Sequence, residues 1–338
     1  MISSLISPIT QQALELNVRR TGDIDRAFIN VTDYWYGSRD NHDRDDRDIS
    51  RAVTDGQFAL DSKHMEPSCP TGNCSFDPFQ SLALCTKMQD ISEFLTVSKE
   101  PFTDDSLNAT LYRLSLPNNV TSEMLHSGFH ARGGNSSLVF GEDEAYPSTL
   151  ANYYLIYTNP GSLEQEDDPM FIAFEIIFYV CVNEYETVVS EGEAHSIIKR
   201  SSSIVDPNHG DTEIEKLECF YPSFTNRTTL TDCSRYDEWF TEQERNMTLA
   251  GYSEYLSPEH KNTFSFDVGM AMTLSYNLKS YLCAFSTFAK GAEKVYFGEA
   301  SVWLETVIWG RKNDETDPKK QANNIGAYFE GISIGVSN

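Results

Sequence analysis

The chain has 338 residues and a formal net charge of −25, with 51 acidic against 26 basic side chains. Hydrophobic residues make up 40% and aromatic residues 12%, which is enough apolar material for a folded core and excludes a disordered chain. Because binding to phosphates requires clustered Lys and Arg, the charge argues against nucleic acid and against an anionic membrane surface as partners.

The first sixty residues predict strands, a loop and a short helix. Residues 8–36 alternate between apolar and polar side chains, which predicts two strands, the second over 27–36. The segment 38–48 contains five Asp and three Arg. It lacks the spacing of a calcium-binding loop and its arginines repel a cation, so a solvated loop is favoured over a calcium site. A short helix around Ala52, ended at Gly56, should follow.

The most distinctive stretch is 69–92, CPTGNCSFDPFQSLALCTKMQDIS, which contains three of the seven cysteines. Pro70 and Gly72 favour a tight turn that brings Cys69 and Cys74 close enough for a local disulfide. The apolar run that follows is suited to a buried core. We interpret this stretch as structural, and we expect the rest of the chain to be arranged around it.

Further strands are predicted before residue 200. They cover 110–116, 153–157, 171–182 with a continuation to 189 past a bulge, and 194–198 after a turn at Gly192. The longest apolar run, 170–182, has thirteen residues and includes Glu175. It is too short for a membrane-spanning helix and therefore predicts a buried strand.

Helical periodicity appears only late in the chain. One helix face is predicted to carry Met270, Leu274, Leu278, Tyr281, Leu282 and Phe285, and another to carry Ala322, Ile325, Phe329, Ile332 and Val336. Between them, 295–310 is predicted as one or two strands that carry both of its tryptophans.

These patterns define a fold class and a division of the chain. The class is α+β, predominantly antiparallel β in sandwich-like sheets, with a few packed helices and disulfide staples. Residues 201–216 are polar, and they are the best candidate for a boundary. The chain 1–338 is therefore one extracytoplasmic domain or two subdomains, 1–200 mainly β and 217–338 mixed.

Motifs for catalysis or metal binding fail on their context. Gly331–Gly335 matches the G-x-S-x-G nucleophile motif, but only three residues remain after it and no His follows. His126 and His130 have a spacing that suits a metal ion on a helix, yet neighbouring glycines favour a surface loop.

A third pattern is the alternation of Glu191, Glu193 and His195 along one predicted strand, which could support acid–base chemistry. Such triplets arise by chance in a chain with 51 carboxylates. No catalytic, cofactor-binding or metal-binding residue is therefore assigned, and no cofactor is expected.

The cysteines and glycosylation signals indicate an oxidising compartment. No C-x-x-C pair occurs, so disulfides are favoured over zinc. Cys219 and Cys233 bracket a Thr-rich loop and should close it with a local disulfide. The chain has seven N-x-[ST] triplets, against about 3.5 expected by chance. The candidate glycosylation sites are Asn30, Asn73, Asn108, Asn119, Asn135, Asn226 and Asn246.

An export signal is missing from the N-terminal segment. Residues 1–20 lack the basic start and the hydrophobic core of a signal peptide. We therefore expect the chain to be an ectodomain excised from a longer protein.

Four segments together form a recognisable pattern. The most specific is C-P-T-G-N-C-S-F at 69–76, continued by F-x-S-L-x-x-C and D-I-S up to residue 92. Softer matches cover 6–12, 174–192 and 324–338. The pattern resembles a family of fungal (ascomycete) membrane proteins classed as a domain of unknown function. The resemblance implies an extracytoplasmic domain held between transmembrane helices outside this chain, at the plasma membrane or another secretory-pathway membrane, with no established activity.

The resemblance also bears on the other cysteines. Members of that family carry cysteines where this chain has Met88 and Ile176, and the joint replacement predicts that these two side chains touch. We further predict that Cys85 pairs with Cys181, which leaves Cys283 as a free thiol on a helix.

Three functional hypotheses remain. In the first, the ectodomain binds a cell-wall component, a protein partner or another extracellular ligand, in sensing or adhesion, without turnover. The second is a secreted hydrolase of unfamiliar type, and the third is a free-standing secreted effector. The first is favoured because no catalytic constellation is present and because the resemblance implies a membrane-anchored domain.

Overall fold

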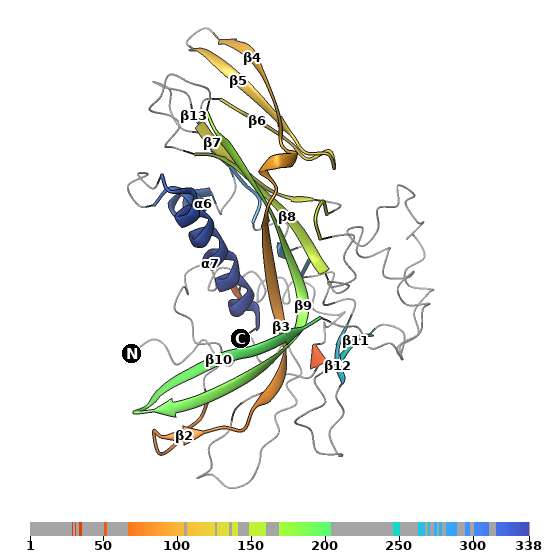
Figure 1. Cartoon of the computed structure of the whole chain (residues 1–338), viewed down its shortest axis with the longest axis vertical. Helices are drawn as coiled ribbons and strands as arrows, with labels where there is room; N and C mark the ends of the chain where they lie inside the picture. The colour runs from red at the N-terminus through yellow and green to blue at the C-terminus, as the bar shows by residue number, and fades with distance from the viewer. Residues whose placement is uncertain are drawn as a thin grey trace.

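The computed structural model describes residues 29, 31, 34–35, 51–52, 67–104, 107–125, 127–134, 137–140, 149–159, 169–203, 246–250, 263–267, 270, 274–275, 277–278, 282–288, 295–297, 301–310 and 316–337. Its strands (Figure 1) are β1 Tyr34–Trp35, β2 Cys74–Ser75, β3 Phe79–Asp90, β4 Thr96–Asp104, β5 Leu107–Ser115, β6 Thr121–Met124, β7 Ser127–Gly134, β8 Thr149–Thr158, β9 Phe171–Ser190, β10 Glu193–Ser202, β11 Asn246–Ala250, β12 Thr263–Asp267, β13 Ala284–Phe288 and β14 Val295–Phe297. The helices whose two ends are both described are the 3₁₀ turn η2 Ser92–Phe94 and the α-helices α6 Ser301–Trp309 and α7 Pro318–Ser337.

The centre of the fold is β9, which runs through an antiparallel sheet of eight strands. One side of β9 pairs with β3 and β2, and the other side pairs with β8 and then β10. The sheet continues from β8 through β7 and β13 to β14. β9 is continuous over twenty residues, and the register shifts lie in its partners β8 and β10. The predicted strand and its continuation to 189 are confirmed, but without the bulge in β9 itself.

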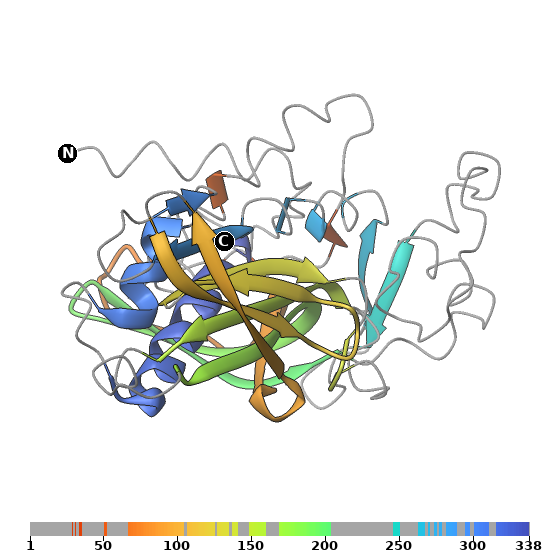
Figure 2. The same cartoon turned by 90° about the horizontal axis from the view of Figure 1, so that it is seen from above.

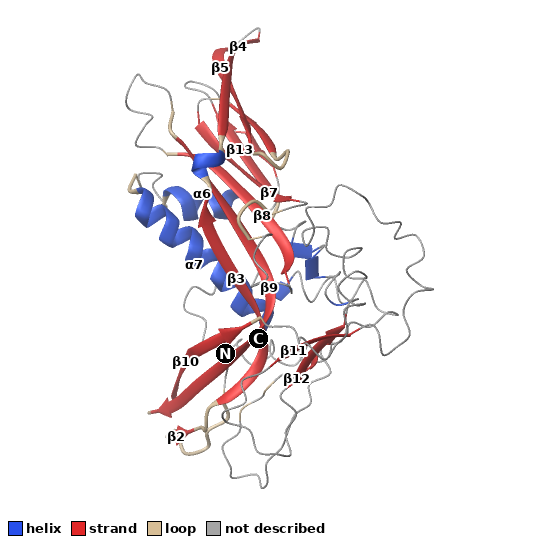
Figure 3. Ribbon diagram, turned by 45° about the vertical axis from the view of Figure 1, so that its right-hand side comes forward, coloured by secondary structure: helices blue, strands red, loops and turns tan. Residues whose placement is uncertain are grey.

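The two faces of β9 pack against different layers. The helix-side face consists of the side chains of alternate residues from Ile172 to Val182, all apolar and all in the largest core cluster. Phe329 of α7 packs on this face, with its ring centroid 6.0 Å from that of Phe178 and 5.6 Å from that of Tyr153. Figure 3 shows α6 and α7 together on one side of the strands.

The disulfide-side face of β9 consists of the intervening residues from Ala173 to Asn183. Near Ala173 it is covered by apolar side chains of the three-stranded sheet β4-β5-β6, including Leu114 and Met124. Figure 2 shows the long strands of this small sheet crossing over the main sheet. Farther along, Cys181 packs with Ala83, Ile177 and Tyr179. The fold is thus predominantly antiparallel β with packed helices, as predicted.

A third, three-stranded sheet is built from β1, β12 and β11, with β1 parallel to β12. It contributes Trp35, Phe264 and Phe266 to the largest core cluster. Because β13 and β14 belong to the main sheet, strands from both halves of the chain share one sheet. The division into subdomains 1–200 and 217–338 stays a prediction.

The prediction of strands over 295–310 is wrong for its second part. β14 covers only Val295–Phe297, and Ser301–Trp309 form the helix α6. Leu304 and Ile308, one helical turn apart, are completely buried in the core. Gly310 ends the helix with a φ of 75°, a conformation that glycine adopts without strain. A short apolar run does not distinguish a strand from a buried helix, and here packing decided between them.

The helix predicted over 270–285 is shorter than expected. Met270, Leu274 and Leu278 are helical and buried, whereas Phe285 lies in β13. Cys283 directly precedes this strand, so its predicted place on a helix is wrong. The second predicted helix is confirmed as α7, with Ile325, Phe329 and Ile332 buried.

The surface loop expected around His130 is also wrong. His130 lies in β7, half-buried, and pairs with Phe285 of β13. The glycines that suggested a loop allow close packing instead, because a Cβ on Gly128 would lie 2.1 Å from the carbonyl oxygen of Ser286. His126 lies outside the described residues.

No described helix combines the length and the apolar character needed to cross a membrane.

Candidate functional site

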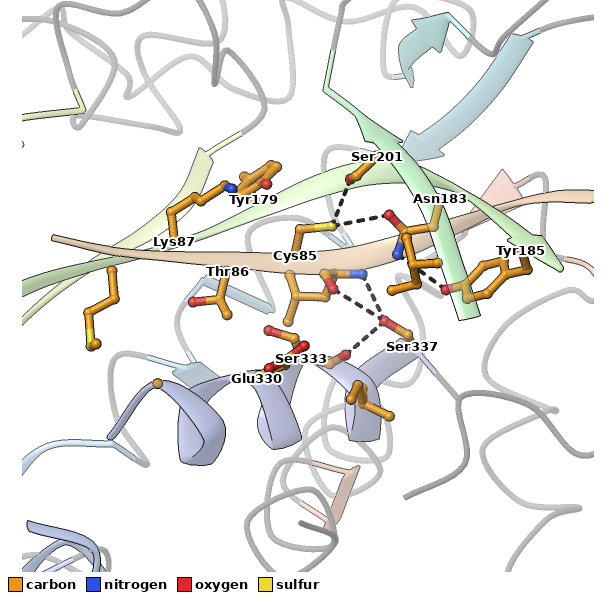
Figure 4. Close-up of a pocket in the computed structure, with 15 residues that line it drawn as sticks. Cys85, Thr86, Lys87, Tyr179, Asn183, Tyr185, Ser201, Glu330, Ser333 and Ser337 are labelled. Atoms are coloured by element: carbon orange, nitrogen blue, oxygen red, sulfur yellow. Dashed lines mark hydrogen bonds between the residues drawn. The ribbon is translucent and has the colours of Figure 1, made fainter. Parts of the chain in front are cut away.

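The candidate site is a cavity of about 350 Å³ at the edge of the main sheet, which we call the β3 groove (Figure 4). β3 contributes its middle residues, and α7 contributes one stripe of its second half. The lining residues are Leu84, Cys85, Thr86, Lys87 and Met88 of β3, Tyr179, Asn183 and Tyr185 of β9, Ile198 and Ser201 of β10, and Gly326, Glu330, Ser333, Ile334 and Ser337 of α7.

The groove runs along an unpaired strand edge. In the described part of the chain, β3 pairs only with β9. Just beyond β3, the Ile91 N–H donates to the Ala173 carbonyl at 2.9 Å, so odd-numbered residues here bond toward β9. The Leu84 N–H points the other way and donates to the Ser337 hydroxyl at 2.9 Å. By this alternation, the N–H and C=O groups of Thr86 and Met88 also point outward into the groove.

Three of the five α7 residues that line the groove have small side chains, namely Gly326, Ser333 and Ser337. Gly326, Glu330, Ser333 and Ser337 are spaced by four, three and four residues, so they share one helix face. A Cβ on Gly326 would lie 3.6 Å from Met88 Cε, which is ordinary contact distance. Ser333 donates to the Phe329 carbonyl at 3.2 Å within the helix. This wall therefore leaves room beside the strand edge.

On the other side of the edge lies the Cys85–Cys181 disulfide, whose Cα atoms are 5.9 Å apart. Cys85 Sγ lies 3.5 Å from Asn183 Oδ1 and 3.4 Å from Ser201 Oγ. The Asn183 amide donates to the Tyr185 hydroxyl at 3.2 Å. The disulfide therefore holds β3 to β9 at the base of the groove, on the side of β3 away from its outer edge.

The groove has two charged lining residues, Lys87 and Glu330, both exposed. They come from opposite walls and their formal charges cancel. Tyr185 is uncharged at neutral pH, as a tyrosine ordinarily is, and burial raises the pKa of its hydroxyl further, despite the hydrogen bond from Asn183. The local charge is thus balanced in a chain whose net charge is −25.

The chemistry available in the groove is hydrogen bonding and apolar contact. No His lines it, and its one carboxylate, Glu330, is exposed and comes from the wall opposite Lys87, so the lining holds no pair of carboxylates and no His–carboxylate pair. The Ser337 hydroxyl lies 2.7 Å from the Ser333 carbonyl oxygen and binds the β3 backbone, so it is engaged in structure. The arrangement is suited to binding.

The predicted disulfides in the described part are confirmed. Cys69 pairs with Cys74, and Cys85 pairs with Cys181. Cys283 carries a free thiol, as predicted, although not on a helix. Cys219 and Cys233 lie outside the described residues, so their pairing stays a prediction.

The Cys69–Cys74 loop is attached to the turn between β9 and β10. The Gly192 N–H donates to the Gly72 carbonyl at 2.9 Å, and the Glu191 N–H donates to Asn73 Oδ1 at 3.1 Å. Gly72 has a φ of 70°, which explains the glycine at this position in the turn. This contact keeps the loop at the far end of the sheet from η2.

Two candidate glycosylation sites have described side chains. Asn73 and Asn119 are exposed, and Asn119 adopts a φ of 63° in the turn between β5 and β6. Asn108 lies in β5 and Asn246 in β11. Glycosylation at all seven positions stays a prediction, with Asn30, Asn135 and Asn226 outside the described residues.

The motifs rejected from sequence have no catalytic geometry. Gly331–Gly335 lies inside α7, and Ser333 is 3% exposed, whereas a nucleophile elbow requires a strand-to-helix turn. Glu191 occupies a turn with a φ of 54°, and Glu193 and His195 are exposed on β10. No group of three His, Cys, Asp or Glu that could hold a metal ion occurs among the described residues.

Sequence reasoning missed the groove. Cys85 and Cys181 were singled out as a structural pair, but nothing in the local sequence indicates that β3 lies at an edge. The one available signal was the spacing of Gly326, Ser333 and Ser337 on the helix face adjoining the apolar stripe of α7.

Comparisons with protein-family models, with curated proteins and with solved structures find no match to this chain.

Proposed function

We propose that this chain is the extracytoplasmic domain of a fungal membrane protein, and that it binds an extracellular ligand in the β3 groove without chemical turnover. The observation that carries the binding role is the outer edge of β3, which no other described strand pairs and which is bordered by α7 and by side chains from the disulfide-side face. An edge strand exposes hydrogen-bonding groups that invite another chain, and proteins usually protect or use such an edge.

The extracytoplasmic location is supported by the covalent chemistry. The two disulfides join Cys69 to Cys74 and Cys85 to Cys181, and disulfides persist in oxidising compartments. Asn73 and Asn119 present N-x-[ST] signals on exposed positions. The attachment to a membrane rests on the resemblance to the fungal family, in which helices outside this chain hold the domain.

A non-catalytic role is supported by the lining of the groove. Its hydroxyls at Ser333 and Ser337 are bonded to carbonyl groups of the fold, and its one carboxylate, Glu330, has no second carboxylate or His beside it in the lining. A hydrolase would require converging carboxylates or an activated nucleophile. The hydrolase and effector hypotheses therefore gain no support from the groove.

The location is tested by secreting the chain from a eukaryotic host. The expected product is several glycans heavier than its sequence mass and returns to that mass on enzymatic deglycosylation. A product with unshifted mass would count against the extracytoplasmic location. Peptide mapping without reduction should recover the Cys85–Cys181 link from the same sample.

The binding role is tested with two ligand classes, soluble cell-wall oligosaccharides and a library of random linear peptides. Gly326→Leu fills the groove from α7, and Gly326→Ala is the matched control because the added Cβ reaches only ordinary contact with Met88. At least one class should bind the wild-type and Gly326→Ala chains and lose affinity for Gly326→Leu. Absence of any binding that responds to Gly326→Leu would refute the proposal.

A further inference from the structure

We infer that the ligand of the β3 groove is an extended peptide segment of a partner protein, which binds by adding a strand to the free edge of β3. This inference rests on the proposed binding function and specifies its ligand class. It follows from the backbone geometry of the edge, from the position of Ser337 and from the side chains that border the groove.

The edge presents a repeating backbone pattern. Thr86 and Met88 each direct an N–H and a C=O away from β9, and neither bonds another described residue through these groups. In a strand, such groups recur every second residue, at roughly 7 Å. A ligand that satisfies both positions must offer donors and acceptors at the same repeat. An extended polypeptide has this repeat in its main chain, whatever its sequence.

Ser337 already acts as a substitute for one strand partner. Its hydroxyl accepts the Leu84 N–H at 2.9 Å and lies 3.5 Å from the Leu84 carbonyl oxygen. Of the two groups that an added strand would bond, this side chain satisfies the N–H, because its own proton is shared mainly with the Ser333 carbonyl at 2.7 Å (Figure 4). It also marks one end of the groove, so the added strand would begin at Thr86 and run past Met88. The pairing segment is then about four residues long.

The walls suit a main chain more than a sugar. Tyr179 and Tyr185 are only 5% and 2% exposed, so neither offers an open aromatic face for a sugar ring. The formal charges of Lys87 and Glu330 cancel, which suits an uncharged backbone. Ile198 and Ile334 provide apolar contacts for alternate side chains of the ligand, as in known cases of strand addition.

A second copy of the chain is a less suitable occupant than a free segment. Edge-to-edge pairing of two β3 strands would bring the α7 helix of each copy into the groove of the other. The cavity of about 350 Å³ holds a short segment, at the lower end of the range for ligand sites. A whole sheet edge with its own flanking helix needs more space.

The test begins by panning phage-displayed random linear decapeptides on the secreted, disulfide-bonded chain. Selected peptides are synthesised and their dissociation constants are measured by fluorescence polarisation. The decisive measurement changes only the ligand: each peptide is N-methylated at one backbone position at a time. Methylation should weaken binding at least tenfold at alternate positions within a stretch of about four residues, because only alternate N–H groups face β3.

A protein-side test uses Thr86→Pro, which removes the outward N–H. Proline is tolerated on an edge strand where its nitrogen faces away from the sheet. Thr86→Val is the matched control, since it keeps the N–H and loses only the hydroxyl that donates to the Ile177 carbonyl. Thr86→Pro should lose at least tenfold in peptide affinity and Thr86→Val should not. If Thr86→Pro does not fold, Gly326→Leu against Gly326→Ala replaces this pair.

Hydrogen exchange gives an independent readout. The amides of Thr86 and Met88 should exchange at least tenfold more slowly with peptide bound, while that of Lys87, already paired with β9, should change little. The inference would be overturned if no peptide is selected, or if N-methylation weakens binding equally at every position. It would also be overturned if the Thr86 and Met88 amides become protected from exchange when the chain concentration is raised without peptide. Oligosaccharide binding sensitive to Gly326→Leu would overturn it while leaving the proposed binding function intact.

Discussion

The two faces of β9 are both buried, yet they are stabilised by different kinds of interaction. The helix-side face is entirely apolar from Ile172 to Val182 and is covered by α7 and its neighbours. The disulfide-side face includes Glu175, Cys181 and Asn183, which are 0%, 0% and 4% exposed. The first face depends on summed packing, which is spread over many side chains. The second face also packs against apolar side chains, but it adds a disulfide and a few directional hydrogen bonds, each of which can be removed singly.

Glu175 illustrates the difference. Its Oε2 accepts the N–H groups of Leu138 and Val139 at 3.0 and 3.1 Å, and so fixes the segment 137–140 against the sheet. Burial raises the pKa of this carboxyl, and hydrogen bonds from Ser137, Leu138, Val139 and Tyr154 oppose the rise. A buried carboxyl thus stands where the other face has Phe174 and Ile176.

The largest effect is expected on the helix-side face, from Phe329→Ala. This ring is 1% exposed and contacts Tyr153 and Phe178, so its removal leaves a cavity in the core. We expect a loss of about 3 to 5 kcal/mol in the free energy of unfolding, measured by urea denaturation. Asn324→Ala, at an exposed position of the same helix, should stay within about 0.5 kcal/mol of wild type. Equal effects at both positions would contradict the assigned core.

On the disulfide-side face, the double variant Cys85→Ala with Cys181→Ala should lose about 2 to 4 kcal/mol. The bond closes a sequence separation of 96 residues, against 5 for Cys69–Cys74. Because a longer loop loses more entropy on closure, the double variant Cys69→Ala with Cys74→Ala is the control and should lose about half as much. A larger loss from the short loop would show that chain entropy is not the main contribution.

A third experiment introduces a disulfide on the helix-side face, between β3 and β9. Met88 and Ile176 are directly opposed in the register of β3 and β9, in agreement with the predicted contact. Met88 is three residues from Cys85 and its side chain lies on the opposite face of β3, so the two pairs lie on different faces of the sheet. The pair is of the non-hydrogen-bonded type, in which the side chains are closest.

We therefore expect Met88→Cys with Ile176→Cys to form a disulfide on secretion. The oxidised variant should be about 1 to 2 kcal/mol more stable than the control Met88→Ala with Ile176→Ala, with a higher Tm by calorimetry. The control also lacks the Met and Ile side chains and keeps the two native disulfides, so the difference reports the added bond. Recovery of two free thiols after oxidative refolding would show that the two Cβ atoms are too far apart.

The smallest effect is expected from Glu175→Gln, as a change in how the free energy of unfolding depends on pH. Since the folded pKa of Glu175 is raised, the folded state holds its proton more tightly than the unfolded state between about pH 4.5 and that raised value. Stability from this group therefore falls as pH rises through the window. Glu175→Gln removes this dependence and keeps the shape, so the stability of wild type relative to the variant should decline with rising pH. A difference independent of pH would contradict the raised pKa.

His130 also makes the stability depend on pH, so its contribution has to be removed from that measurement. Burial, with the nearby charge of Arg132, lowers its pKa to about 4. The unfolded state binds the proton more tightly between about pH 6.5 and 4, so its contribution to stability is lost as pH falls, the opposite sign to Glu175. The chains with and without Glu175→Gln should therefore both carry His130→Gln when their stabilities are compared over the pH range.

The sequence alone determined those features that depend on short-range geometry or on a long, regular pattern. The turn residues Pro70 and Gly72 predicted the Cys69–Cys74 bond, because closing a short loop needs only local backbone conformation. The spacing of Ile325, Phe329 and Ile332 predicted α7, because it recurs at the helical period over several turns. The apolar run 170–182 predicted β9, because it is too short to span a membrane as a helix.

Only the tertiary structure decided the features that depend on neighbours. Ser301–Trp309 is a helix because Leu304 and Ile308 must both reach one core, although the same residues are compatible with a strand. His130 lies in a strand because Gly128 allows the backbone of Ser286 to approach. The outer edge of β3 is open past Leu84 because the last residue of α7, Ser337, bonds the β3 backbone at Leu84, and no described strand other than β9 pairs with β3. A local pattern shows which groups a strand offers, but which of them stay unpaired depends on where distant segments pack.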